Sequence, residues 1–176
     1  MSIRRFQDKT PVIHQNAYID TDAVIIGDVI IEEDASVWPN AVLRGDVQQI
    51  RIGKRTSIQD GCVCHVTHKS SFQPEGIALI VGNDVTVGHS VILHACQIGD
   101  ESLIGMGSIL LDGCVVGSRV LLGAGSLVSP GMVLESGYLY IGRPAVKKRA
   151  LIEEELRYFS YSANHYVKLK NQYLSV

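Results

Sequence analysis

Aliphatic side chains recur at every sixth residue through most of the chain, and this period restricts the fold more than any other feature of the sequence. A six-residue period contains the two-residue alternation of a β-strand and does not match the period of an α-helix. Each unit therefore predicts a short strand followed by a tight turn, and three units are expected to close one triangular coil. Strands of successive coils would stack in parallel at ~4.8 Å, with the aliphatic side chains inside. The predicted inward positions are Ile13, Ile19, Ile25, Ile31, Val37, Leu43, Ile52, Ile58, Cys64, Val81, Val87, Leu93, Ile98, Ile104, Leu110, Val116, Leu122, Val128 and Leu134.

Glycine directly follows many of these inward positions, as at Gly53, Gly82, Gly105 and Gly123. We expect it to relieve the backbone at the turn of each unit, because glycine adopts conformations that other residues avoid. Two Gly-x-Gly pairs, Gly105-Met106-Gly107 and Gly123-Ala124-Gly125, do not indicate a nucleotide-binding site, because no strand-then-helix unit surrounds them.

The six-residue period is interrupted between Val66 and Leu79 and ends near Arg143 and Pro144. The interruption is polar and predicts a loop that bulges from the coil. After residue 150, apolar side chains recur three and four residues apart, which indicates an amphipathic α-helix. The sequence thus predicts a mainly β protein, with a parallel β-helix of hexapeptide repeats in residues 1–144. Residues 145–176 form a helical extension, whose α-helix is expected to pack along the flat side of the β-helix.

The composition argues against several classes of function. A net charge of −2 gives no electrostatic footprint for nucleic acid, and no stretch reaches the ~20 apolar residues of a membrane-spanning helix. The basic N-terminus has no apolar run behind it, so we expect no secretory signal. All four cysteines lie within the six-residue period, and we expect them to be reduced core residues of a cytoplasmic protein.

Polar residues beside the inward positions fall on particular faces of the predicted coil. If the interruptions are loops that add no side to a coil, every third unit lies on the same face. One such face carries Arg44, His65 and His94 in successive coils, with neighbouring side chains ~5 Å apart. Gln59 and His89 belong to the adjacent face. His65 and His94 could thus bind one ion at zinc–nitrogen distances of ~2.1 Å, while His89 of the same chain faces round the corner.

A metal site with three imidazoles therefore needs a ligand from elsewhere. The simplest source is His89 of a neighbouring subunit in a homotrimer, which would give three equivalent sites about a threefold axis. A single outward histidine on a solenoid is usually an ordinary surface residue, but three in compatible positions on adjacent coils favour a metal site.

The hexapeptide repeats, His65, the His89-x4-His94 spacing and the C-terminal helix together resemble the gamma-class carbonic anhydrase family. The resemblance covers essentially the whole chain. It implies a left-handed β-helix, which the period alone does not specify, and a homotrimer. It also implies zinc, or alternatively iron or cobalt, bound between subunits by two histidines of one chain and one of the next.

The resemblance also assigns roles to residues outside the histidine set. Arg44 and Asp46 are similar to an Arg-x-Asp motif that forms ion pairs across the trimer interface, and Asp60 resembles their partner. Gln59 resembles the glutamine that orients the water at the metal. Tyr166 is similar to an aromatic residue that lines the pocket. Arg44 and Asp46 could equally have a purely structural role.

The activity that the resemblance implies is the hydration of carbon dioxide to bicarbonate by a water activated at the metal. Val47 departs from the family pattern, which has a glutamate there, and the 66–79 segment lacks the acidic proton-shuttling loop. Three alternatives remain open: hydrolysis of an acyl-CoA thioester, acyl transfer with a histidine as general base and no metal, and a metal-stabilised trimer without catalysis.

Overall fold

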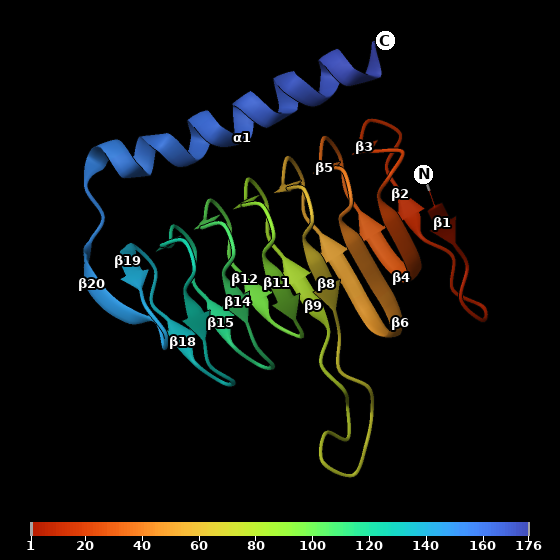
Figure 1. Cartoon of the computed structure of the whole chain (residues 1–176), viewed down its shortest axis with the longest axis horizontal. Helices are drawn as coiled ribbons and strands as arrows, with labels where there is room; N and C mark the ends of the chain where they lie inside the picture. Colours follow the sequence, from red (N-terminus) through yellow and green to blue (C-terminus); the bar gives the residue numbers. More distant parts are fainter. Residues whose placement is uncertain (1, 176) are drawn as a thin grey trace.

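The computed structural model describes residues 2–175, which form a β-solenoid of stacked parallel coils with one α-helix along it (Figure 1). An eight-stranded sheet forms one face, which we call the helix face. Its strands are β3 (Tyr18–Ile19), β5 (Ser36–Val37), β7 (Ser57–Ile58), β10 (Thr86–Val87), β13 (Leu103–Ile104), β16 (Leu121–Leu122), β19 (Tyr138–Ile141) and β20 (Val146–Ala150).

A 12-stranded sheet folds round a corner and forms the other two faces. The histidine face contains β8 (Val63–His65), β11 (Ile92–His94), β14 (Ile109–Leu110) and β17 (Leu127–Val128). The third face contains β2 (Val12–Ile13), β9 (Leu79–Val81), β12 (Gln97–Ile98), β15 (Val115–Val116) and β18 (Val133–Leu134). Two long strands, β4 (Val24–Ile31) and β6 (Val42–Ile52), run along both faces, and β1 (Ser2–Arg4) pairs with the start of β4.

The strand register agrees with the count by sixes. On the histidine face, Leu43 pairs with Cys64, Cys64 with Leu93, and Leu93 with Leu110. All of these side chains are fully buried and form one continuous apolar column inside the coil. Their burial removes apolar surface from water at every level of the stack, which is the main stabilising contribution in such a fold.

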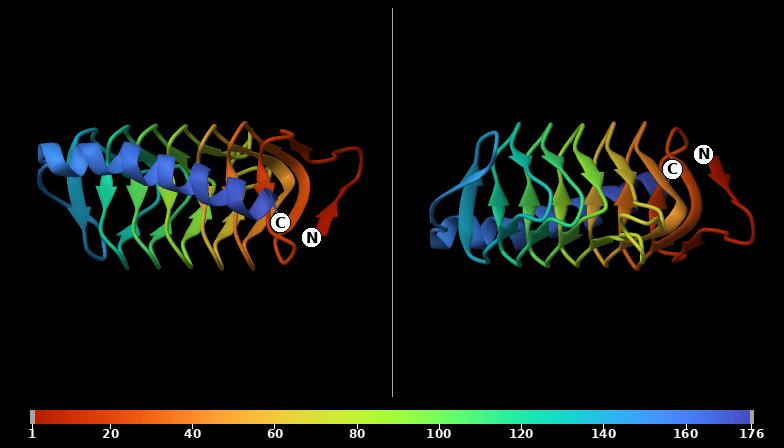
Figure 2. Two further views of the ribbon diagram at one scale, coloured as in Figure 1. Left: turned by 90° about the horizontal axis from the view of Figure 1, so that it is seen from above. Right: turned by 90° about the horizontal axis from the view of Figure 1, so that it is seen from below.

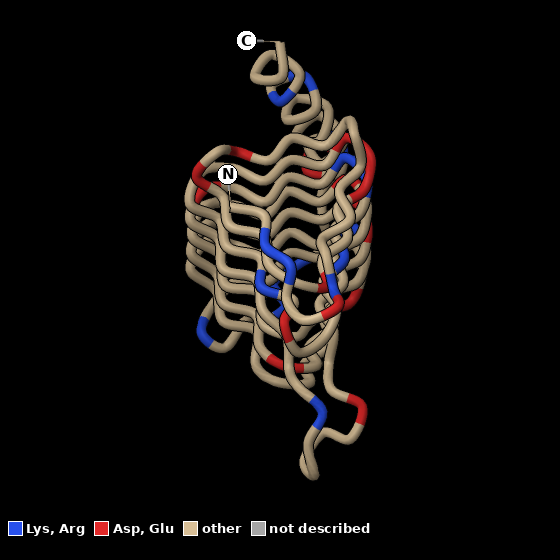
Figure 3. The backbone as a smooth tube through the Cα atoms, turned by 90° about the vertical axis from the view of Figure 1, so that its right-hand side faces the viewer, with Lys and Arg blue, Asp and Glu red and all other residues tan. Residues whose placement is uncertain are grey.

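Neither interruption of the period adds a side to a coil. The first is absorbed where β6 turns the corner, since its start pairs with β8 and its end with β9. The second, residues 66–79, leaves the coil as a loop whose base is closed by an antiparallel bridge between Thr67 and Ile77. Viewed end on, this loop and the helix lie on opposite sides of the stack (Figure 3).

The glycines that follow inward positions have a different cause from the one expected. Gly53 and Gly82 have no left-handed backbone conformation. A Cβ at Gly53 would instead lie 2.5 Å from the carbonyl carbon of Gly82 in the next coil. Coil-to-coil proximity therefore demands glycine there, and the prediction of backbone relief was wrong for these positions.

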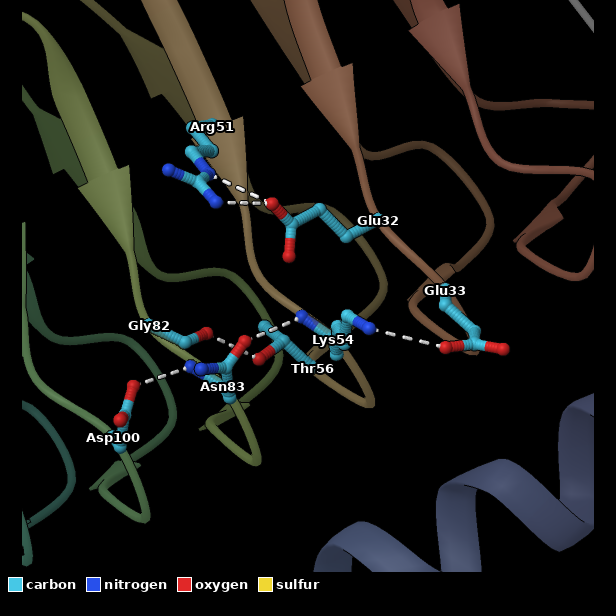
Figure 4. Close-up of polar contacts among 8 residues, drawn as sticks. All are labelled: Glu32, Glu33, Arg51, Lys54, Thr56, Gly82, Asn83 and Asp100. Atoms are coloured by element: carbon cyan, nitrogen blue, oxygen red, sulfur yellow. Dashed lines mark hydrogen bonds and ion pairs between the residues drawn. The ribbon is translucent and has the colours of Figure 1, made fainter.

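Polar side chains reinforce the same corner of the solenoid (Figure 4). The backbone N–H of Lys54 donates to the Asn83 side chain at 2.9 Å, and the N–H of Asn83 donates to Asp100 at 2.7 Å. The Thr56 hydroxyl donates to the carbonyl of Gly82 at 2.7 Å. This ladder satisfies backbone groups that the short strands leave unpaired.

The C-terminal extension begins with a strand that the sequence did not predict. Strand β20 pairs antiparallel with β19 and covers the edge of the last coil, whose backbone groups would otherwise lack partners. Helix α1 (Glu153–Leu174) then runs back along the helix face, as predicted (Figure 2). No helix among residues 2–175 is long and apolar enough to cross a membrane.

Helix α1 is fixed to the N-terminal coils near its own C-terminus. Lys170 is 1% exposed, and its Nζ donates to the carbonyl of Asn16 at 2.6 Å and lies 2.7 Å from Asp34 Oδ1. The ring of Trp38 packs against Tyr166 and Tyr173 of the helix, with centroids 5.9 and 5.4 Å apart. These contacts hold the helix on one face of the solenoid.

The four cysteines are free thiols buried in the core, in agreement with the prediction from their spacing. Burial raises the pKa of the Cys62 thiol to about 11. A thiol with so high a pKa is almost wholly protonated at neutral pH and therefore unreactive.

Candidate metal centre

Two imidazoles meet on the histidine face. His65 ends β8 and His94 ends β11, and the two residues are direct partners in the strand register. Their rings face each other, with Nδ1 of His65 3.2 Å from Nε2 of His94. Both side chains are partly buried, at 19% and 33% exposure. The stacking of successive coils is thus what brings residues 65 and 94 together.

A carboxylate engages the far nitrogen of each ring. His65 Nε2 lies 3.1 Å from Asp46 Oδ1, and His94 Nδ1 lies 2.6 Å from Asp112 Oδ1. An ionised carboxylate can only accept, so in neutral rings these two nitrogens carry the hydrogen and donate it. The facing nitrogens, Nδ1 of His65 and Nε2 of His94, then both carry lone pairs.

This arrangement fits a divalent cation. Two lone pairs aimed at each other across 3.2 Å repel unless a positive charge lies between them. Two imidazole nitrogens on one tetrahedral zinc ion are separated by ~3.4 Å, close to the distance seen. A carboxylate on the far nitrogen is also the usual support of a metal-binding histidine.

The ionisation states of the pair agree with this donor set. Burial would raise the pKa of Asp46, but hydrogen bonds from Arg44 and His65 outweigh it and lower that pKa below its ordinary value. Burial also lowers the pKa of His65, against the opposing hydrogen bond to Asp46. Asp46 is therefore charged and His65 neutral near pH 7, as a metal ligand must be.

His89 lies apart from this pair. It occupies the turn after β10, at the edge of the helix face, with its side chain 49% exposed. Its Nδ1 donates to Asp60 Oδ2 at 2.9 Å, which leaves the lone pair of Nε2 available to a ligand. Within residues 2–175, no three His, Cys, Asp or Glu side chains converge on one point. A single chain therefore presents two of the expected ligands in one place and the third in another.

Gln59 and Tyr166 accompany His89 on the helix face. Gln59 is 5% exposed and lies in the same groove lining as Tyr166 of α1. Burial raises the pKa of Tyr166, so this hydroxyl is neutral at physiological pH. All three residues line a groove of about 590 Å³ between the helix and the sheet. Its other walls are mainly apolar, from Leu103, Met106, Leu121, Leu139, Tyr158 and Tyr161.

The remaining expected residues take intrachain partners. Arg44 follows Leu43 in the same column as the histidines, and its Nη1 lies 2.5 Å from Asp46 Oδ2. Asp46 thus bridges Arg44 and His65, whereas Asp60 supports His89. The structure therefore gathers the predicted residues into two groups, one on each side of a corner.

The sequence analysis did not identify Asp112 or Thr67 as site residues. Asp112 lies in the turn after β14, two residues beyond Leu110, so it is not directly next to an inward position. Burial would raise its pKa, but hydrogen bonds from Thr67 and His94 lower it. The Thr67 hydroxyl donates to Oδ2 of Asp112. A search for an aspartate that lies one coil after a histidine, at the position that stacks beside it, could have identified Asp112.

Comparison with known proteins agrees with the repeat pattern. The family model for bacterial transferase hexapeptide (six repeats) matches residues 10–45 and 95–130. The chain is 54% identical to Protein YrdA of Escherichia coli over 172 residues, covering 98% of this chain and 94% of that protein. It is 44% identical to a carbonic anhydrase of Geobacillus kaustophilus over 168 residues, covering 96% and 88%.

Two further relatives extend the comparison. Gamma carbonic anhydrase 3, mitochondrial, of Arabidopsis thaliana is 48% identical over 162 residues, covering 92% of this chain and 62% of that protein. A crystal structure of a hexapeptide transferase family protein from Anaplasma phagocytophilum superposes with a TM-score of 0.89 at 40% identity, covering 98% of each chain. The chain therefore belongs to the gamma-class carbonic anhydrase-like family of hexapeptide-repeat proteins.

Proposed function

We propose that this protein hydrates carbon dioxide to bicarbonate at a divalent metal site completed between subunits of a homotrimer. The observation that carries the proposal is the facing pair of His65 Nδ1 and His94 Nε2, whose far nitrogens are both held by carboxylates. The carbonic anhydrases among its relatives support the reaction. His89 of the neighbouring subunit would be the third ligand, because its side chain is half exposed and its hydrogen bond to Asp60 uses Nδ1 and leaves Nε2 available.

Zinc is the expected ion, with ferrous iron and cobalt as alternatives, since all three accept imidazole nitrogen. When bound, such an ion supplies a Lewis acid that activates water for attack on carbon dioxide. Asp46 and Asp112 keep the two imidazoles of one chain oriented by hydrogen bonding to their far nitrogens, and burial favours the neutral form of His65. Gln59 lies on the same face as His89 and would reach the site with it, where its amide can hold the attacking water by hydrogen bonding. Tyr166 would line the pocket next to Gln59.

The test is elemental analysis combined with measurement of mass in solution, on the native protein and on His89→Ala. We expect about one metal ion per chain in a native trimer and loss of the metal in the variant. Hydration of carbon dioxide, followed by stopped flow with zinc- and iron-loaded protein, then measures the activity. Tight metal binding in an intact trimer without hydration would show a metal-stabilised scaffold instead.

Proton export gives a second test. The exposed Val47 takes the place of a titratable glutamate next to Asp46, so this side chain cannot pass protons to solvent. We expect the maximal rate of hydration to rise several-fold with the concentration of an external buffer, because the buffer replaces the missing proton acceptor. A Val47→Glu variant should show a weaker dependence on buffer. A rate independent of buffer in the native protein would contradict this expectation.

The groove beside His89 favours one alternative activity. At about 590 Å³ it is far larger than carbon dioxide needs and has the size and apolar lining of a site for a larger ligand. An acyl group of a thioester would fit these walls, so the second candidate is an acyl-CoA hydrolase or acyltransferase. Turnover of a panel of acyl-CoA thioesters, with and without metal, distinguishes the two: hydrolysis that needs metal and exceeds hydration would favour the alternative.

A further inference from the structure

The base of the 66–79 loop is connected to His94 by a short chain of hydrogen bonds. Thr67, the second residue after β8, donates its hydroxyl to Oδ2 of Asp112. The other oxygen, Oδ1, accepts from His94 Nδ1 at 2.6 Å. Thr67 is itself fixed by a backbone bridge to Ile77 at the far end of the loop. Both oxygens of Asp112 are thus engaged, one by a loop residue and one by the imidazole.

The two carboxylates behind the histidines are held in different ways. His65 is supported by Asp46, which is itself held by Arg44 on the same strand, β6. Asp112 instead lies in a turn between β14 and β15, where a side chain has more freedom than on a strand. The Thr67 hydroxyl limits that freedom, because it binds the carboxylate oxygen that His94 does not use.

We propose that Asp112 is a positioning residue that fixes the tautomer and orientation of His94, and that Thr67 couples this contact to the 66–79 loop. The inference rests on the proposed metal site. In the resulting tautomer Nδ1 of His94 carries the hydrogen, and Nε2 offers its lone pair toward His65. The loop then acts on the metal site through the placement of Asp112, without a residue of its own among the ligands.

The first test needs no metal. Nitrogen-15 NMR of metal-free protein labelled at histidine reports which ring nitrogen carries hydrogen, and a His94→Gln sample assigns the resonances. We expect the Nδ1–H form for His94 in the native protein and a mixture, dominated by the form found in free histidine, in Asp112→Ala. Asp100→Ala is the matched control, because it removes a carboxylate that is hydrogen bonded within the same solenoid but to no histidine.

The second test measures zinc affinity by competition with a coloured chelator. Loss of a carboxylate behind a metal-binding histidine weakens binding roughly 10- to 100-fold, and we expect this for Asp112→Ala but not for Asp100→Ala. Asp112→Asn keeps an accepting oxygen and should lose less. Thr67→Val should show a smaller loss in the same direction, while Thr67→Ser, which keeps the hydroxyl, restores native affinity.

The outcomes separate this inference from the proposed function. If native protein binds zinc and Asp112→Ala binds it equally well with an unchanged His94 tautomer, the role of Asp112 is overturned and the metal site stands. If native protein binds no zinc, the metal site fails, and the NMR result alone decides whether Asp112 sets the tautomer. Should Asp112→Ala fail to fold, Asp112→Asn and Thr67→Val carry both measurements.

Discussion

The histidine face and the helix face hold two parts of one candidate site and differ in what surrounds them. On the histidine face two imidazoles lie 3.2 Å apart, beside the outward side chains of Val63 and Ile92, which are 42% and 39% exposed. On the helix face a lone His89 stands at the corner, next to a sheet that α1 covers. The first part has ligands and an exposed apolar surface, while the second has a ligand and a pocket.

This difference is the reason why the proposed site needs a second chain. The two parts lie on different faces of the solenoid, and among residues 2–175 no third metal-binding side chain joins the two histidines. A second copy placed with its corner against the histidine face would supply the missing imidazole and cover the apolar residues at once. Four experiments probe the two faces.

The largest effect is expected when a metal ligand of each part is removed, with the two substitutions in different chains. His89→Ala and His94→Ala should each lose the metal almost completely. If the variants are mixed, unfolded together and refolded at equal amounts, interfaces with intact ligands from both chains reappear. Random assembly into trimers should restore about one quarter of the native metal and activity.

Recovery of metal in the mixture shows that the two parts meet across an interface, and measurements of bound zinc and of hydration check it together. A control mixture of His65→Ala with His94→Ala removes ligands from the same part and should recover nothing. Equal recovery in both mixtures would contradict the shared site.

The next effect concerns the exposed apolar residues. Ile92 points outward beside His94, so Ile92→Arg would place a charge in the proposed interface, where its desolvation opposes assembly. We expect the concentration at which trimers dissociate to rise roughly tenfold or more, as measured by analytical ultracentrifugation. Val133→Arg is the matched control, since Val133 is 64% exposed on the third face and its substitution should leave assembly unchanged.

A smaller effect is expected from Lys170, whose contacts hold α1 on the helix face. Lys170→Met leaves Asp34 and the carbonyl of Asn16 without their partner and should cost about 2–3 kcal/mol in the free energy that holds α1 on the coil. The fluorescence of Trp38, the single tryptophan, reports release of the helix because its ring contacts two helix tyrosines. Lys168→Met, an exposed change on the same helix, should leave the fluorescence transition where it is.

The smallest effect depends on pH at the start of the helix. The hydrogen bonds from Arg149 lower the pKa of Glu155 from 4.5 to about 2. The carboxylate therefore stabilises the folded protein fully above pH 4.5, and this contribution is lost as the pH falls toward 2. Thermal unfolding of native protein and Glu155→Gln should differ most above pH 5 and converge in acid. A difference in unfolding temperature between the two proteins that grows on acidification would contradict this prediction.

Most of the fold could be predicted from the sequence because a solenoid repeats a single local rule. Each inward residue fixes the next at a spacing of six, so the faces and the meeting of His65 with His94 follow from counting. Strand β20 could not be found in this way, because its position depends on the open edge of β19 and not on a period of its own.

The site was harder to predict than the fold, because parts of it also depend on features outside the repeat. Asp112 reaches His94 from a turn, where the direction of a side chain depends on local backbone angles, such as the left-handed Gly113 that follows it. The reason for Gly53 also lies in the distance between coils and not in its own residue pattern. The third ligand of the proposed site would come from another chain, so counting along one sequence can show only that His89 lies on a different face from His65 and His94.

The histidines also occupy a sheltered level of the stack. On the helix face β7 and β10 have β5 and β3 on one side and β13, β16 and β19 on the other. A solenoid frays inward from its ends, so several coils must open before the ligands lose their framework. Amide hydrogens around residues 63–65 and 92–94 should accordingly exchange among the slowest in the molecule, and the chemistry would outlast partial melting of either terminus.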